Sequence, residues 1–318
     1  MLHFKQTILL ELKKQKSLAL PLIPMNSTWF AKTAITTAFL GRLGELQLAA
    51  GSILTGLCWA MEPICGQAHG ANNHKLLHKT LLMTVILLLL TTLPISLLWL
   101  YTDKILTLFG QNREITALAK NCVLYLLPDL LLTSFLAPLK AYLSSQSKTL
   151  PIMFSSGVAV AFHLPFNIFL SKIKGIEGVA LATALTDLSA TIMLAFYVLA
   201  TESWIYEGWW KQQLSEWTRL LTLSAQCCFS GCLEWWCYEI LILLAGRMGD
   251  AQRNVAVLTL VLNFDYLLYG VMVSLSTCAS TRVSNELGLP FGLLALSPAE
   301  LVVIDGRLER RMGIFVQS

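Results

Sequence analysis

Residues 81–100 read LLMTVILLLLTTLPISLLWL and carry no charged side chain. An α-helix rises about 1.5 Å per residue, so this stretch would extend about 30 Å, which matches the hydrocarbon core of a bilayer. An uncharged apolar stretch of this length is typical of a membrane-spanning helix, and it predicts one here.

Other apolar runs satisfy the same length criterion, and together they predict about eight transmembrane helices. They lie near residues 18–40, 46–65, 80–101, 121–139, 150–170, 176–200, 220–245 and 254–279. The predicted fold class is therefore an all-α polytopic membrane protein. We expect a multi-pass protein embedded in the lipid bilayer of the plasma membrane or of a vacuolar or other endomembrane.

The composition argues against several other classes of protein. Of the 318 residues, 55% are hydrophobic and 13% are charged, whereas a soluble domain has about 25% charged residues. The net charge is +4 and the basic residues are scattered, so no nucleic-acid partner is expected. The sequence has no H-E-x-x-H, G-x-S-x-G or phosphate-binding glycine motif, which argues against an enzyme. The eight cysteines form no C-x-x-C pair, and neither a metal nor a cofactor is expected.

The distribution of lysine and arginine predicts a cytoplasmic N-terminus, because cytoplasmic loops are enriched in these residues. With that orientation, the inner segments hold more basic residues than the outer loops, and Lys75, Lys79, Lys140 and Lys211 are among them.

An internal repeat indicates two related halves. The first predicted span ends at Gly41–Glu45 and the seventh at Gly246–Asp250, and both segments place an acidic residue after Gly-Arg-x-Gly. The second and eighth spans end in the similar small and polar segments Cys65–Gly70 and Ser284–Gly288. The interval between these motifs is shorter in the first half, so the second helix is predicted to be shortened.

The repeat predicts four segments along the chain. They are a complete six-helix N-terminal lobe at 1–200, a cytoplasmic inter-lobe linker at 201–219, a partial C-terminal lobe of two helices at 220–288, and a divergent tail at 289–318. By comparison with the first half, the second half is expected to lack four helices. The tail is expected to be either an amphipathic segment or a read-through or frameshifted end.

Leu233–Glu239 (LEWWCYE) resembles the seventh-helix signature of the multidrug and toxic compound extrusion (MATE) family of transporters, and of the plant DETOXIFICATION-type members in particular. Met61–Ala71 resembles the end of their second helix, and Ser280–Gly288 resembles the end of their eighth. Phe39–Leu46 fits the same family, and the motifs follow one another in the family order.

The resemblance implies two six-helix lobes that face a central cavity. It also implies antiport, in which organic, often cationic, xenobiotics or secondary metabolites are exported in exchange for protons, or for sodium in some bacterial branches, and the Glu-Trp-Trp motif favours protons. The expected partners are therefore a small organic substrate and protons. The chain departs from the family in its shortened second helix and in the four absent helices. The alternative is an inactive or regulatory product of a truncated transporter gene.

The candidates for proton coupling are two acidic residues of the seventh-helix signature, Glu234 and Glu239. A charged group at the centre of a span costs about 2.5–3.5 kcal/mol on insertion scales, so it is normally kept for a reason. Glu234 has apolar neighbours on both sides, and burial opposes the ionisation of a carboxyl group. It either exchanges protons during transport or makes a neutral structural hydrogen bond.

Two neighbours of Glu234 are candidates for the substrate cavity. Tyr238 lies four residues further on and shares the helix face of Glu234. Trp235 either offers an aromatic face to an organic cation or packs against lipid and neighbouring helices.

Three charged residues of the first half are further cavity candidates. Asp129 follows a proline in the fourth span, where it either contributes to transport or stabilises a bend. Asp187 lies in the sixth span, and Lys32 in the first span is expected to pair with one of the acids. His163 in the fifth span is expected to be a hydrogen-bonded core residue, and the small residues Gly157 and Gly178 are expected to allow close helix packing.

Overall fold

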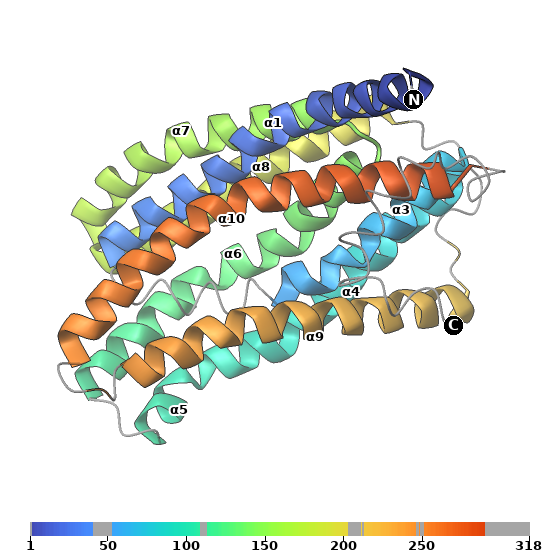
Figure 1. Cartoon of the computed structure of the whole chain (residues 1–318). Coiled ribbons are helices and arrows are strands. Elements are labelled where there is room, and N and C mark those ends of the chain that lie inside the picture. The colour runs from blue at the N-terminus through green and yellow to red at the C-terminus, as the bar shows by residue number, and fades with distance from the viewer. Residues whose placement is uncertain are drawn as a thin grey trace.

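The computed structural model describes residues 2–40, 53–108, 113–202, 211, 213–245, 248 and 251–289, which form helices joined by short turns (Figure 1). These ranges contain no β-strand. The helices are α1 (Leu2–Leu40), an unlabelled helix at 53–59, α3 (Met61–Gly70), α4 (His74–Leu100), α5 (Thr102–Leu108), α6 (Arg113–Ser145), α7 (Thr149–Lys174), α8 (Ile176–Thr201), α9 (Leu214–Ala245) and α10 (Ala251–Leu287).

The predicted spans coincide with these helices wherever the structure describes them. Four helical segments of the described chain are long and apolar enough to cross a membrane: His74–Leu100, Lys120–Ser145, Thr149–Lys174 and Ile176–Thr201. Large apolar side chains also point outward, and Phe154 and Phe196 are each more than two thirds exposed. This arrangement suits a lipid environment, and the all-α membrane fold is confirmed.

Several helices extend beyond the boundaries predicted from hydropathy. α1 begins at Leu2, well before the span predicted from residue 18, and α10 continues to Leu287. An apolar run marks the part of a helix that suits hydrocarbon, whereas backbone hydrogen bonds continue the helix into polar surroundings. The short helix α5 was not predicted, because seven residues are too few to give a spanning run.

Some sequence predictions fall on parts of the chain that the structure does not describe. The shortening of the second helix concerns the interval from Gly44 to Gly70, whose first part, up to residue 52, is not described, and the motif Gly41–Glu45 lies outside the described residues too. Most of Gly246–Asp250 and the tail from residue 290 are also outside the described residues. The division into lobes stays a prediction, with α8 ending at Thr201 and α9 beginning at Leu214.

The largest apolar core joins the helices of the first half. Its fully buried side chains include one or more from the helix at 53–59, α4, α6, α7 and α8, for example Leu54, Leu77, Leu126, Ile152 and Leu194. Figure 1 shows α1, α7 and α8 side by side along one edge of the molecule.

Smaller contacts attach α9 and α10 to this first half. Leu220 of α9 packs in a cluster with Ile64 of α3 and with residues of α4. Cys278 of α10 packs against α1 residues in a second cluster. Arg282 of α10 also binds both carboxylate oxygens of Glu11 in α1, at 2.9 and 3.3 Å.

Helices α7 and α8 form a tight hairpin. Gly175 turns the chain between them with a φ of 60°, a conformation that glycine adopts without steric cost. A Cβ atom at Gly178 would lie 2.0 Å from the carbonyl oxygen of Leu170, so only glycine permits this approach. The packing role of Gly178 is confirmed, but that of Gly157 is wrong, because a Cβ atom there would meet nothing within 4 Å.

Candidate functional site

A cavity of about 370 Å³ lies between the helices of the first half and α10. This volume falls within the roughly 300–1,000 Å³ typical of small-molecule sites. Its walls come from α1, the helix at 53–59, α3, α4, α6, α7, α8 and α10. The described part of α9 contributes no lining residue. Charged, aromatic and hydroxyl side chains are interspersed among apolar ones, as expected for a site that binds an organic molecule.

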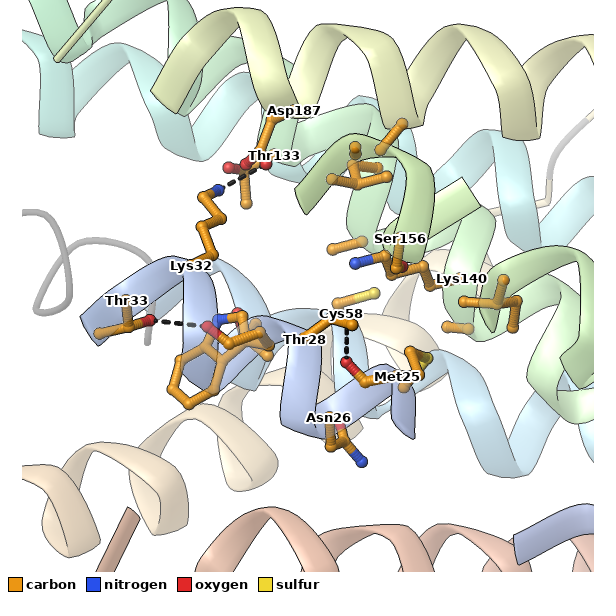
Figure 2. A pocket seen from close by; sticks show the side chains of 18 of the residues that line it. Met25, Asn26, Thr28, Lys32, Thr33, Cys58, Thr133, Lys140, Ser156 and Asp187 are labelled. Atoms are coloured by element: carbon orange, nitrogen blue, oxygen red, sulfur yellow. Dashed lines mark hydrogen bonds and ion pairs between the residues drawn. The ribbon is translucent and has the colours of Figure 1, made fainter. Parts of the chain in front are cut away.

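An ion pair bridges two walls of this cavity. The Nζ of Lys32 in α1 lies 2.5 Å from Oδ1 of Asp187 in α8 (Figure 2). The two side chains are 15% and 13% exposed, so most of the pair is removed from solvent. The prediction that Lys32 pairs with an acid is confirmed. The partner could not be read from the sequence, because it depends on which helices face α1.

Asp129 of α6 lines the same cavity and is 4% exposed. Lys32, Asp129 and Asp187 therefore border one cavity, which brings three of the predicted residues together. The backbone carbonyl of Asp129 accepts a hydrogen bond from the hydroxyl of Thr133, at 2.9 Å. The choice between a transport role and a bend-stabilising role for Asp129 stays open.

The candidates of the seventh-helix signature lie on α9. The side chains of Glu234, Glu239 and Trp235 are outside the described residues, although the helix backbone there is described. The Tyr238 hydroxyl donates a hydrogen bond to Oδ2 of Asp265 in α10, at 3.1 Å. Tyr238 is not among the cavity-lining residues. It therefore links α9 to α10.

Trp59 connects the cavity to α9. Its ring lines the cavity, and a Cβ atom added at Gly231 of α9 would lie 3.1 Å from the Cζ3 atom of this ring. Glu234 follows Gly231 by three residues, which is less than one helical turn. The α9 backbone that carries Glu234 thus meets the cavity wall at Trp59.

Two charged cavity residues, Glu62 of α3 and Lys140 of α6, were not predicted from the sequence as cavity residues. Glu62 lies within the predicted span 46–65, so the cost of a charged group inside a span, applied to Glu234, also singles out Glu62. Lys140 was assigned to an inner segment just after the predicted span 121–139. That span ends too early, since α6 continues to Ser145 and Lys140 lines the cavity. Three tryptophans, Trp29, Trp59 and Trp99, also line it and were not singled out.

His163 lies behind the cavity wall as a core residue. It is fully buried, and its Nδ1 and Nε2 atoms hydrogen-bond the hydroxyls of Thr186 and Thr36, at 2.8 and 3.1 Å. The prediction of a hydrogen-bonded core histidine is confirmed. No group of three or more potential metal ligands occurs among the side chains that the structure describes.

An ion pair outside the cavity joins the two halves near the start of α9. The Nζ of Lys79 in α4 lies 2.6 Å from Oε1 of Glu216. Partial burial opposes ionisation of Glu216, but the hydrogen bonds from Lys79 and from the Gln213 backbone, together with the charge of Lys79, outweigh it and lower the pKa of Glu216.

Known proteins match this chain in both sequence and fold. The MatE family model matches residues 21–169 and 227–289. The chain is 54% identical to Protein DETOXIFICATION 56 of Arabidopsis thaliana over 98% of its own length and 67% of that protein. It is 41% identical to Protein DETOXIFICATION 48 of the same plant, over 81% of this chain and 52% of that protein. The chain thus spans about half to two thirds of the length of these relatives.

Solved structures of the same kind share the fold. The eukaryotic MATE transporter AtDTX14 matches with a TM-score of 0.77 and 27% identity, over 98% of this chain and 75% of that one. An outward-facing multidrug resistance MATE family transporter of the MOP superfamily matches with a TM-score of 0.74 and 17% identity, over 94% and 72% of the two chains. The second likeness concerns the fold alone.

Proposed function

We propose, since the chain belongs to the MatE family of membrane transporters, that it exports small organic compounds across a membrane in exchange for protons. The compounds would be xenobiotics or secondary metabolites, cationic ones among them. The membrane would be the plasma membrane or a vacuolar or other endomembrane.

The observation that carries this proposal is the charged cavity between the helices. Ionisable groups inside a membrane protein are costly, and they commonly mark a substrate or ion pathway. Lys32, Asp129 and Asp187 line such a cavity, and we propose that they contribute to substrate binding. Trp235 of α9 is proposed as a further contact, whereas Tyr238, the other α9 candidate, lies outside the lining. The cavity is large enough for a small organic molecule.

Proton coupling is assigned to Glu234, with Glu239 as the second group. Apolar surroundings oppose ionisation of a carboxyl group. A small change in those surroundings can then switch the group between its neutral and its charged form. Protonation of Glu234 would weaken its attraction for a cationic group, and substrate and proton would then compete. The contact between Trp59 and Gly231 supports this proposal, since it joins the α9 turn before Glu234 to the cavity wall.

The movement is proposed to be a rocking of two lobes about the cavity, as in other secondary transporters built from repeats. The N-terminal lobe would be residues 1–200 and the second lobe would begin with residues 220–288, joined by a linker at 201–219. The N-terminus would lie in the cytoplasm.

The test is efflux of a cationic rhodamine dye from vesicles that contain the full 318-residue chain. An imposed pH gradient should drive dye transport by the wild-type protein, and Glu234→Gln should abolish the dependence on the gradient. The matched control is Glu177→Gln, which removes a carboxylate from the first turn of α8 away from the cavity lining.

Equal gradient-driven efflux by wild type and Glu234→Gln would overturn the coupling role. Absence of efflux from a folded wild-type chain would overturn the transport proposal. That second outcome would favour the alternative, an inactive or regulatory product.

A further inference from the structure

Two cysteine thiols meet on one face of α9, away from the cavity described above. Cys228 and Cys232 are four residues apart, so they lie on neighbouring turns of the same helix face. Their Sγ atoms are 3.8 Å apart, within hydrogen-bonding distance for two thiols. Neither cysteine lines the cavity, and the transport function proposed above gives this pair no role.

The helix favours the reduced form of this pair. Side chains four residues apart on a helix have Cβ atoms about 5–6 Å apart, whereas a disulfide requires a Cβ–Cβ distance of about 3.5–4.5 Å. A direct bond between the two sulfur atoms would therefore distort α9. Both cysteines are free thiols in the structure, and both can react with another molecule.

The spacing of the two sulfur atoms suits one soft atom that bridges them. Two sulfur–metal bonds of about 2.3 Å at a tetrahedral angle hold their sulfur atoms about 3.8 Å apart. The Sγ atoms of Cys228 and Cys232 already have this separation. A bridging atom of similar size can therefore bind both thiols with little rearrangement of the helix.

The number of donors favours a ligand that needs two sulfur atoms and no further protein group. Zinc sites use three or four protein ligands, and the side chains that the structure describes include no group of three or more potential metal ligands. A trivalent arsenic atom that already carries one organic substituent forms two further bonds. Its valence matches a pair of thiols.

The surroundings of the pair allow such a molecule to approach from the lipid. Phe229 and Leu233, each next to one of the cysteines, are 63% and 50% exposed, as expected for a surface that faces hydrocarbon. Cys228 is half-buried and Cys232 is 7% exposed. A neutral, lipid-soluble arsenical can therefore bind Cys228 first and Cys232 second.

Packing against the first half of the chain holds the thiols in place. The Sγ of Cys228 lies 3.9 Å from the carbonyl oxygen of Ile53. A Cβ atom added at Gly56 would lie 3.0 Å from the Cα of Cys228, so α9 and the helix at 53–59 are in close contact here. A fixed backbone lowers the entropy that the two side chains lose when they bind one ligand.

We propose that Cys228 and Cys232 form a covalent binding site for trivalent arsenicals that carry one organic substituent. With phenylarsine oxide, the arsenic atom forms one bond to each sulfur while the arsenic–oxygen bond breaks. The two thiol protons leave with that oxygen as water, and arsenic stays trivalent, so no oxidant or reductant is needed. The second arsenic–sulfur bond forms within the molecule, which favours this pair over separate thiols.

The test uses the full 318-residue chain in lipid nanodiscs. Phenylarsine oxide is added with an excess of 2-mercaptoethanol, a monothiol that competes for single cysteines. Intact-mass spectrometry should show that wild type retains phenylarsenic, and 2,3-dimercaptopropanol should release it. After removal of the monothiol, peptide mapping with N-ethylmaleimide should show Cys228 and Cys232 of wild type protected together, a measurement that needs no variant.

Three variants assign the site. Cys228→Ala and Cys232→Ala should each lower the retained phenylarsenic about tenfold or more, because only a single arsenic–sulfur bond is then left. The matched control is Cys227→Ala, which removes the adjacent thiol. Neighbouring residues of a helix do not face the same way, so this variant should bind as wild type does. Thermal unfolding checks that each variant is folded.

The proposal is overturned if wild type retains no phenylarsenic in the presence of the monothiol, or if Cys228→Ala or Cys232→Ala retains as much as wild type. A loss in Cys227→Ala equal to that in Cys228→Ala would overturn it as well. The measurement involves neither dye nor pH gradient, so its result is independent of the proposed transport function.

Discussion

Lys32 shows what a single lysine requires in order to remain inside a membrane helix. Its ammonium group is only 2.5 Å from Asp187, and both side chains are largely buried. Removal of one partner would leave an uncompensated charge, which costs about 3–5 kcal/mol in buried pairs. Replacement of both partners by apolar residues of similar size is often neutral or stabilising.

We therefore predict that Lys32→Met and Asp187→Leu each strongly lower the melting temperature of the protein in detergent. The double variant should melt closer to wild type than either single variant. Thermal unfolding with a common detergent and pH checks this. A double variant that loses as much stability as the two single losses combined would contradict the buried ion pair.

Glu216 gives a prediction about pH. Its pKa in the folded protein lies below the ordinary value of 4.5 because Lys79 and the Gln213 backbone stabilise its charged form. A lowered folded-state pKa contributes stability above the ordinary pKa, and this contribution is lost as the pH falls through the lowered value. Glu216→Gln should therefore destabilise the protein at neutral pH but not at a pH below both values. A difference in stability between wild type and Glu216→Gln that does not change with pH would contradict this prediction.

At the level of helices, the ends of α3 and α10 meet through equivalent residues of the two halves. A Cβ atom at Gly70 would lie 1.9 Å from the Asn285 carbonyl oxygen, and one at Gly288 would lie 2.1 Å from that of Gln67. Gly70 corresponds to Gly288 in the repeat, and Gln67 corresponds to Asn285. The contact therefore has approximate two-fold symmetry, although the repeat was detected from sequence alone.

We predict that Gly70→Ala and Gly288→Ala each destabilise the protein by about 1–3 kcal/mol, because the added methyl group overpacks this junction. The matched control is Gly157→Ala in α7, where nothing lies within 4 Å of the added atom. That substitution should be neutral or stabilising, since alanine favours a helix by about 0.5–1 kcal/mol over glycine. Chemical unfolding in mixed micelles measures the stability of all three variants. A Gly70→Ala variant that is as stable as wild type would contradict the close approach of α3 and α10.

Helix positions were predictable because apolar runs of spanning length have few alternatives in a membrane protein. The ends of the helices were not predictable, because α1 continues through the lysine-bearing segment before residue 18 without an apolar signal. Gly178 and Gly157 show that the sequence also does not decide which small residues are needed for close helix packing. The sequence indicates a small residue in both cases, but only the packing of α7 on α8 decides that Gly178 is needed.

Across the full chain, the cavity joins residues that lie far apart in sequence. Lys32 and Asp187 were recognised as unusual charges, but their pairing needs α1 to lie beside α8. Lys140 was left outside the predicted span 121–139 because hydropathy falls before the helix ends at Ser145. Membership of the cavity depends on the rotation of each helix and on its neighbours, and a single sequence contains no direct measure of either.

The account depends on Glu234 of α9 changing its charge when a substrate enters the protein. The most direct measurement is proton release in a weakly buffered solution, followed with a pH indicator while a cationic rhodamine dye binds to the purified full chain. Wild type and Glu177→Gln should release protons on dye binding, and Glu234→Gln should release far fewer at equal dye occupancy. Equal proton release from all three proteins, or none from wild type with bound dye, would contradict the account.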